Sequence, residues 1–123
     1  MRVPEHLSYT KEHEWLDVTE EIATMGLTDF AQDSLGEVVF VELPETGSQL
    51  TEGQSCGEIE STKSVSELYA AASGEVVEVN ERVLSEPELV NTDPYGQGWL
   101  LKIRVTGQPE LLTATAYAEL IKE

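Results

Sequence analysis

The sequence predicts a mainly β protein, a small β-sandwich or flattened barrel with short helices and a C-terminal helix. Short apolar segments alternate with turns that contain Gly or Pro, which is typical of this class. Two of these segments repeat one pattern: 36–41 reads Gly-Glu-Val-Val-Phe-Val, and 74–79 reads Gly-Glu-Val-Val-Glu-Val. The length of 123 residues fits one domain. We therefore expect a single domain over 1–123, with a β core at about 9–105.

The first half of the chain contains three expected strands and a helix. Strands are expected at 9–16, where Trp15 would enter the core, and at 20–25. A helix is expected from Thr28 to Gly36, because Thr28 is a good N-cap and Gly36 is suited to the C-terminal end. The apolar run 38–43 predicts the next strand, which ends at Pro44.

The second half predicts two more strands, at 74–79 and 99–105. Asn80 is a suitable cap for a short helix over 80–84, and the Pro and Gly residues of 87–98 indicate loop. A helix is expected at about 109–122. The apolar spacing of Leu112, Ala116 and Leu120 predicts it.

The most distinctive local feature is one lysine between two strand-like stretches. Lys63 is flanked by Ser61, Thr62 and Ser64, with Ile59 before them and Val65 to Tyr69 after them. This arrangement predicts a hairpin with Lys63 at its tip. A lysine amine can be acylated, so an exposed tip suits the attachment of a flexible arm, although most exposed lysines carry no such group.

The net charge of the chain limits the kinds of partner that it can bind. The chain has 24 acidic and 7 basic residues, a formal net charge of −17. Such a surface repels nucleic acid and anionic membranes, so neither is expected as a partner. It favours basic protein surfaces.

Other signals are weak or absent. Cys56 is the only cysteine, which excludes an intrachain disulfide and fits a reducing compartment. We expect it to be a small, buried residue within a strand. His6 and His13 match no common zinc spacing, so no metal site is expected. The N-terminus lacks the features of a signal or transit peptide, and no apolar run reaches membrane-spanning length. A cytoplasmic protein without side-chain catalysis is expected.

Five motifs in order resemble those of the glycine cleavage system H proteins, a family of lipoyl carriers. They are His13-Glu-Trp15, 26–44, 60–70, 73–80, and 91–96 followed by 98–100. The resemblance runs from about Tyr9 to the last helix. One departure is Ala71, where similar proteins often have proline.

The resemblance implies the lipoyl/biotinyl-type hybrid barrel-sandwich fold, with lipoic acid joined to Lys63 through an amide. It also implies a non-catalytic carrier that moves the aminomethyl group of glycine. The implied partners are a pyridoxal-phosphate glycine decarboxylase, a tetrahydrofolate-dependent aminomethyltransferase, a dihydrolipoyl dehydrogenase with FAD and NAD, and a lipoate-attaching enzyme.

A carboxylate in a cleft would hold the cationic aminomethyl group and limit access of water. Glu14, within the His13-Glu-Trp15 motif, is the first candidate, and Glu12 and Glu67 are weaker ones. With 24 acids in the chain, most are expected to be solvated surface charges.

Three alternatives remain open. The first is a lipoyl or biotinyl domain of another system, although Thr62 and Ser64 stand where biotin carriers usually have methionine. The second is a lipoate donor that does not serve glycine cleavage. The third is an enzyme with a catalytic lysine, which is disfavoured because such a lysine needs burial or cationic neighbours, whereas Glu58, Glu60 and Glu67 surround Lys63.

Overall fold

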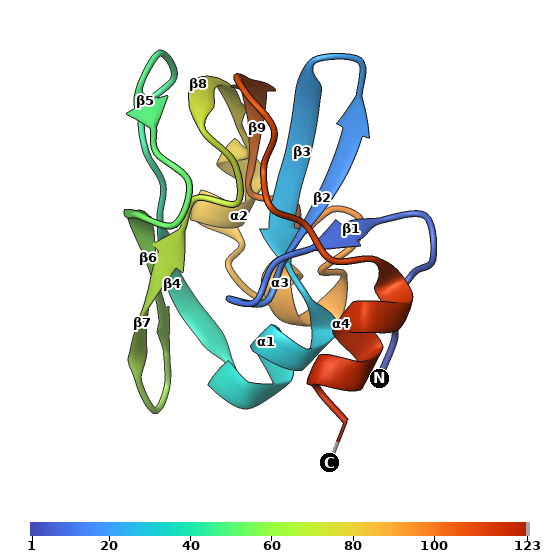
Figure 1. Cartoon of the computed structure of the whole chain (residues 1–123). Helices are drawn as coiled ribbons and strands as arrows, with labels where there is room; N and C mark the ends of the chain where they lie inside the picture. The colour runs from blue at the N-terminus through green and yellow to red at the C-terminus, as the bar shows by residue number, and fades with distance from the viewer. Residues whose placement is uncertain (123) are drawn as a thin grey trace.

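Two β-sheets and four short helices make up the computed structural model, which describes residues 1–122 (Figure 1). The larger sheet has the strand order β1-β2-β3-β9-β8-β5, and the smaller has the order β4-β6-β7. All the strand pairs are antiparallel. The mainly β class predicted from the sequence is confirmed. Residue 123, the last of the expected domain, lies outside the described residues.

The larger sheet contains six strands. Its strands are β1 (Ser8–Tyr9), β2 (Glu14–Thr19), β3 (Ile22–Leu27), β5 (Gln49–Leu50), β8 (Gly74–Val79) and β9 (Leu101–Val105). The β2–β3 hairpin places Glu14 opposite Leu27, at the end of the sheet where α1 begins. The register thus brings the start of β2 to the start of a helix.

The smaller sheet carries the lysine hairpin. It contains β4 (Val38–Glu42), β6 (Ser55–Ser61) and β7 (Val65–Tyr69). β6 lies between the other two, so β6 and β7 project together as a hairpin with residues 62–64 at the tip. The predicted hairpin around Lys63 is confirmed.

One helix joins the large sheet to the small one, two lie between β8 and β9 of the large sheet, and the fourth closes the chain. They are α1 (Asp29–Leu35), α2 (Glu81–Ser85), α3 (Leu89–Thr92) and α4 (Ala114–Leu120). Thr28 caps α1 by accepting the backbone N–H of Ala31, and Asn80 caps α2 by accepting that of Arg82, as predicted. The stretch 87–98, expected to be mostly loop, is so except for the short α3.

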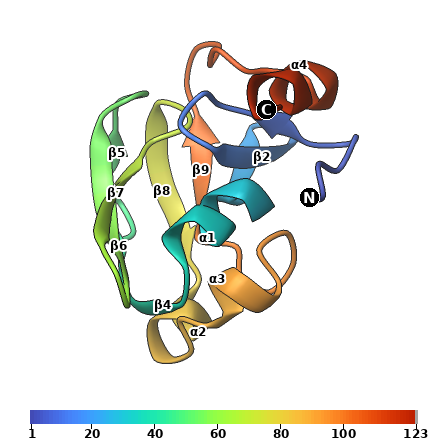
Figure 2. The ribbon, with the colours of Figure 1, turned by 90° about the horizontal axis from the view of Figure 1, so that it is seen from below.

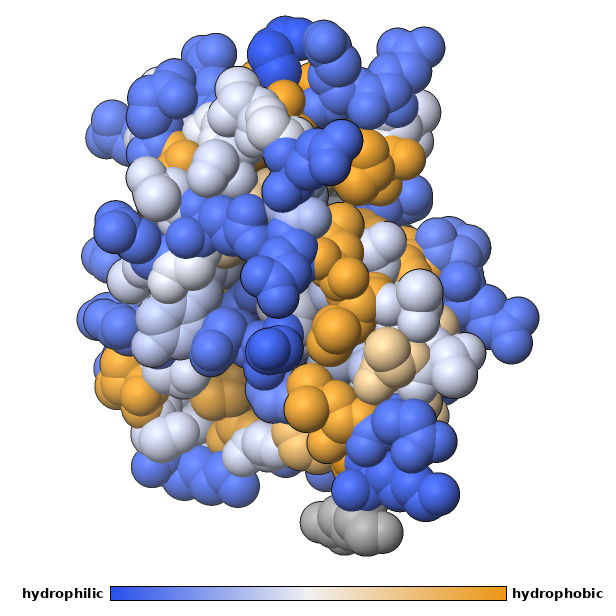
Figure 3. Space-filling model, in the orientation of Figure 1, coloured by the Kyte–Doolittle hydropathy of each residue, from blue (hydrophilic) through white to orange (hydrophobic). Residues whose placement is uncertain are grey.

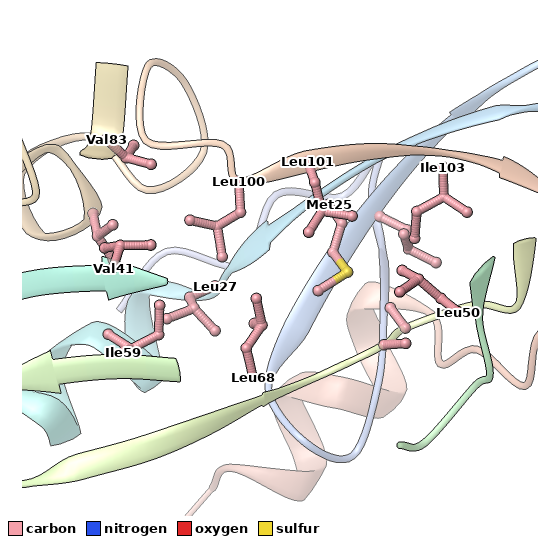
Figure 4. Close-up of a cluster of buried hydrophobic side chains, with 14 of the residues drawn as sticks. Met25, Leu27, Val41, Leu50, Ile59, Leu68, Val83, Leu100, Leu101 and Ile103 are labelled. Atoms are coloured by element: carbon pink, nitrogen blue, oxygen red, sulfur yellow. The ribbon is translucent and has the colours of Figure 1, made fainter. Parts of the chain in front are cut away.

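The core fills the space between the two sheets. Met25, Leu101 and Ile103 come from the large sheet, and Ile59 and Leu68 come from the small one (Figure 4). Each is almost fully buried, and apolar burial is the main favourable term in folding. The lysine hairpin is therefore anchored by inward-facing residues of β6 and β7, while its outer face stays in solvent.

The first expected strand is interrupted. Residues 9–16 are divided into β1 and β2 by a turn, in which the backbone N–H of His13 donates to the Thr10 carbonyl (3.2 Å). His13 has φ +70°, a left-handed conformation that does not continue a strand. The prediction of one continuous strand was wrong, because this turn carries no Gly or Pro signal.

The last helix is shorter than expected. It begins at Ala114, because Thr113 accepts the backbone N–H of Ala116 (3.1 Å) and acts as the N-cap. Leu112 lies outside it and forms a β-bridge with Tyr9. Leu120 is 49% exposed, so the predicted apolar face was also wrong; Tyr117 is the residue that α4 buries.

Seen from below, the N-terminus and α4 lie on one side of α1, and the β6–β7 hairpin lies on the other (Figure 2). Within residues 1–122, we find no helix whose length and apolar character would let it span a membrane.

Candidate functional site

The hairpin tip is held by one serine side chain. Ser61 Oγ accepts the backbone N–H groups of Lys63 (3.3 Å) and Ser64 (3.1 Å). The Ser61 backbone N–H donates to the Ser64 carbonyl (2.8 Å). A serine hydroxyl that satisfies the following backbone groups is a known turn former. This role of Ser61 was not predicted from the sequence, although two serines three residues apart at a turn could have indicated it.

Lys63 is exposed, and its side chain lies against a glycine. A Cβ atom added to Gly36 would lie 3.3 Å from Cε of Lys63. The tip is also tied to the segment after α1, since the Thr62 backbone N–H donates to the Glu37 carbonyl (3.0 Å). The backbone next to Lys63 is therefore held by hydrogen bonds, and its side chain can lie across the C-terminal end of α1 because Gly36 has no side chain there.

A cleft of about 430 Å³ lies beside the tip. One wall is formed by residues 12–14 and Leu27, the floor by one face of α1, and the other wall by Ile59 and residues 64–67. Pockets that hold small organic ligands have volumes of about 300–1,000 Å³. In the view of Figure 3, hydrophilic side chains cover much of the surface, and an apolar band crosses its centre.

Glu14 is the buried acid of this cleft. Its side chain is 2% exposed, and the Thr10 hydroxyl donates to its Oε1 (2.6 Å). Burial raises the pKa of Glu14 from 4.5 to about 7, while the hydrogen bonds from Thr10 and the Tyr69 backbone oppose this rise. A carboxyl in this state responds to a neighbouring cation, which favours its charged form.

The raised pKa of Glu14 has a direct consequence for stability. At a pH between 4.5 and about 7, folded Glu14 keeps a proton that the unfolded chain has released. The stabilisation from this group is therefore present below pH 4.5 and is lost as the pH rises through about 7. Keeping Glu14 buried at neutral pH costs stability, as is common for groups at functional sites.

The other two candidate acids also line the cleft, but they are exposed. Glu12 lies on the same wall as Glu14, and Glu67 lies across the cleft on β7. The structure thus brings together all three acids singled out in the sequence. Glu12 and Glu14 also line a smaller hollow of about 180 Å³ next to Glu52 and Glu110.

His13 is part of the cleft wall, a role that the sequence analysis did not assign. Its Nδ1 lies 2.8 Å from the Tyr117 hydroxyl oxygen, and its ring packs on Phe30 of α1 at 4.7 Å between centroids. Burial lowers the pKa of His13, although the charge of Glu12 opposes this effect. Tyr117 is 104 residues away in sequence, so no local pattern could have indicated this contact.

The cysteine and the acidic and histidine side chains form no further reactive or metal-binding site among residues 1–122. Cys56 lies in β6 and is half-buried, and burial raises the pKa of its thiol to about 12, so it stays protonated and unreactive at neutral pH. It is thus less buried than expected. Among residues 1–122, no group of three or more His, Cys, Asp or Glu residues is arranged to hold a metal ion.

Comparison with known proteins identifies the family of this chain. The family model described as "Glycine cleavage H-protein" matches residues 7–123. The chain belongs to the glycine cleavage H-protein family. The resemblance seen in the five sequence motifs is confirmed.

Individual relatives support the family over nearly the full length. The glycine cleavage system H protein of Thermobifida fusca is 55% identical, with 98% of this chain and 96% of that protein covered. The H protein of Beutenbergia cavernae is 56% identical, with 98% and 97% covered. A crystal structure of the H protein from Mycobacterium marinum has a TM-score of 0.91 and 47% identity, and 94% of this chain and 96% of that one are aligned.

Proposed function

We propose that this H-family protein carries lipoic acid in amide linkage to Lys63 and uses the cleft beside it to shelter an aminomethyl cation. The observation that carries the proposal is the position of exposed Lys63 next to a cleft that contains the buried carboxyl of Glu14. The family membership supports the role of carrier in glycine cleavage.

The residues present fit such an arm. Gly36 leaves room beside the lysine stem, and the cleft is large enough for a small organic group. When attached, the lipoyl group supplies the thiol chemistry that accepts and releases the aminomethyl group. The protein supplies reach, orientation and protection from water.

Glu14 would act on the amine of this cargo. An ionised carboxylate next to the amine keeps the amine protonated, because the two charges attract strongly away from bulk water. A protonated amine has no lone pair with which to expel the sulfur, so loss of the carbon to water is slowed. Glu12 and Glu67, at the exposed edge of the cleft, would add weaker attraction.

The partners follow from the same proposal. The loaded arm would visit a pyridoxal-phosphate glycine decarboxylase, a tetrahydrofolate-dependent aminomethyltransferase and a dihydrolipoyl dehydrogenase with FAD and NAD. A lipoate-attaching enzyme would modify Lys63. The net charge of −17 favours basic docking surfaces on these proteins. A cytoplasmic location remains a prediction.

Intact mass and peptide mapping after incubation with lipoate and a lipoate-attaching enzyme test the attachment site. We expect one lipoyl increment on Lys63 in the wild type and in the control Lys11→Arg, which changes another exposed lysine. Lys63→Arg should fold normally and gain nothing. A lipoyl increment on the Lys63→Arg protein would overturn the assignment.

The role of Glu14 is tested by the lifetime of the isolated loaded protein, measured as release of ammonia. Glu14→Ala should be lipoylated normally but release ammonia roughly tenfold to a hundredfold faster, since a hydrogen bond to a charged group contributes about 1.5–3 kcal/mol. Glu58→Ala removes an exposed acid that does not line the cleft and serves as the control. An unchanged rate in Glu14→Ala would count against this role.

A further inference from the structure

A continuous hydrogen-bond network joins the C-terminal helix to the wall of the cleft. The Tyr117 hydroxyl lies 2.7 Å from Thr28 Oγ1 and 2.8 Å from His13 Nδ1. Thr28 is the N-cap of α1, and His13 lines the cleft next to Glu14. Tyr117 and Thr28 are 0% exposed, so water does not compete for these bonds.

The hydrogens of this network favour one arrangement. Thr28 Oγ1 already accepts the backbone N–H of Ala31 (3.2 Å), so its own hydrogen is available to the Tyr117 oxygen. The Tyr117 hydroxyl then donates to Nδ1 of His13. In this arrangement each hydroxyl donates once, and the His13 ring is neutral with its proton on Nε2.

A protonated His13 would disrupt the network. Its Nδ1 would become a donor, so Tyr117 would have to turn its hydrogen to Thr28, whose own hydrogen has no other acceptor among the described residues. A buried donor without a partner is costly. Burial of the ring acts in the same direction, because it disfavours the imidazolium form.

We propose that Tyr117 is a positioning residue that holds His13 as the neutral Nε2–H tautomer, so that the cleft presents negative charge alone to a cationic cargo. An imidazolium beside Glu14 would offset its carboxylate and repel the amine. The titratable groups around the ring are Glu12 and Glu14 in its own segment, Tyr117 of α4, and Glu67 across the cleft on β7. α1 presents the uncharged Phe30.

The tautomer is tested on the full chain without lipoate, by imidazole ¹H–¹⁵N correlation spectra over a range of pH. The chain has two histidines, and exposed His6 is an internal reference in the same spectra. We expect wild-type His13 to carry its proton on Nε2 in the neutral form. In Tyr117→Phe, which keeps the ring, both tautomers should appear and the midpoint of His13 titration should shift, while His6 stays unchanged.

Tyr9→Phe is a matched control. Tyr9 stacks on Tyr117 with 4.7 Å between ring centroids, but its hydroxyl donates to the Pro4 carbonyl, outside the network. This variant should leave the His13 signals as in the wild type. Unchanged His13 signals in Tyr117→Phe, or equal changes in both variants, would overturn the proposal.

The consequence for the cargo rests on the proposed function and has a separate readout. Loaded Tyr117→Phe should release ammonia about fivefold faster than the wild type, a factor equivalent to one net hydrogen bond, and Tyr9→Phe should not. If the tautomer shifts but the release rate does not, the link to cargo retention is wrong. If wild type and Glu14→Ala release ammonia equally fast, the shelter itself is wrong, and the spectra still decide the tautomer.

Discussion

The two repeated segments fold alike but serve different parts of the molecule. Segment 36–41 leads into β4 of the small sheet, and segment 74–79 forms β8 of the large sheet. Each contains a register shift at the same place: one residue, Val39 or Val77, is inserted between its paired neighbours. Each also begins with a glycine of positive φ. The weak repeat in the sequence therefore reflects a shared backbone design.

The difference lies in what surrounds the two glycines. A Cβ atom on Gly74 would lie 2.1 Å from the backbone oxygen of Arg104, inside the large sheet. A Cβ atom on Gly36 would meet only the end of the Lys63 side chain, at 3.3 Å. Gly74 is thus constrained by the backbone of the neighbouring strand, while Gly36 is adjacent only to the flexible side chain of Lys63. The same local sequence does not imply the same tolerance to change.

The largest expected effect is that of Gly74→Ala. The added methyl group would overlap the Arg104 carbonyl, and φ of +151° is unfavourable for any residue with a side chain. We expect a loss of about 4 kcal/mol or more in the free energy of unfolding, measured by urea denaturation. A loss below about 1 kcal/mol would show that β8 and β9 can separate without cost, and the contrast with Gly36 would fail.

Substitutions at the two buried valines should cause similar losses in the free energy of unfolding. Val38 is 2% exposed and Val76 is 0% exposed, and both face the core between the sheets. Replacement of either by Ala removes two carbon atoms and leaves a cavity, so each should cost about 2 kcal/mol. Urea denaturation of the two variants side by side measures this. A clear inequality would mean that one copy of the pattern contributes more to the core.

Much of this comparison could be predicted from the sequence, because it depends on local patterns. Alternating apolar residues and Gly or Pro turns indicated the strands, and small polar residues around Lys63 indicated the exposed tip. Capping by Thr28 and Asn80 was likewise local. These features need no knowledge of distant residues.

The cleft wall could not be predicted in the same way. The burial of Glu14 depends on how β2 packs against the lysine hairpin, and the state of His13 depends on Tyr117, 104 residues later. The apolar spacing of Leu112, Ala116 and Leu120 gave a wrong face for the last helix, because Leu112 bonds to Tyr9 as a β-bridge instead. Long-range pairing overrides the local period in each case.

A smaller effect is expected for Gly36→Ala. The conformation at Gly36, φ +81° and ψ −157°, is nearly exclusive to glycine, so the variant should lose about 1–2 kcal/mol. The Lys63 side chain is flexible and exposed, and it can move away from the new methyl group. We therefore expect a folded protein in urea denaturation that still gains one lipoyl increment on Lys63. Unfolding comparable to that of Gly74→Ala would remove the contrast between the two glycines.

The smallest effects are expected at the fifth position of the repeat, where the two copies differ. Phe40 is 49% exposed and lies opposite Glu60 on β6, whereas Glu78 lies 3.7 Å from Nζ of Lys102. Phe40→Glu would place two like charges across the strands and should cost less than about 1 kcal/mol, with the cost decreasing at high salt. Phe40→Gln is the uncharged control, and its stability should not depend on salt in this way.

The matching change in the other copy, Glu78→Gln, removes only an exposed ion pair and should cost at most about 0.5 kcal/mol. Urea denaturation at low and high salt measures both effects, and both costs should decrease as salt is added, because salt screens the repulsion in Phe40→Glu and the ion pair that Glu78→Gln removes. If neither substitution changes the free energy of unfolding at low salt, the outer face of β4 tolerates additional negative charge. In that case Phe40 is not needed to limit repulsion next to the lysine hairpin.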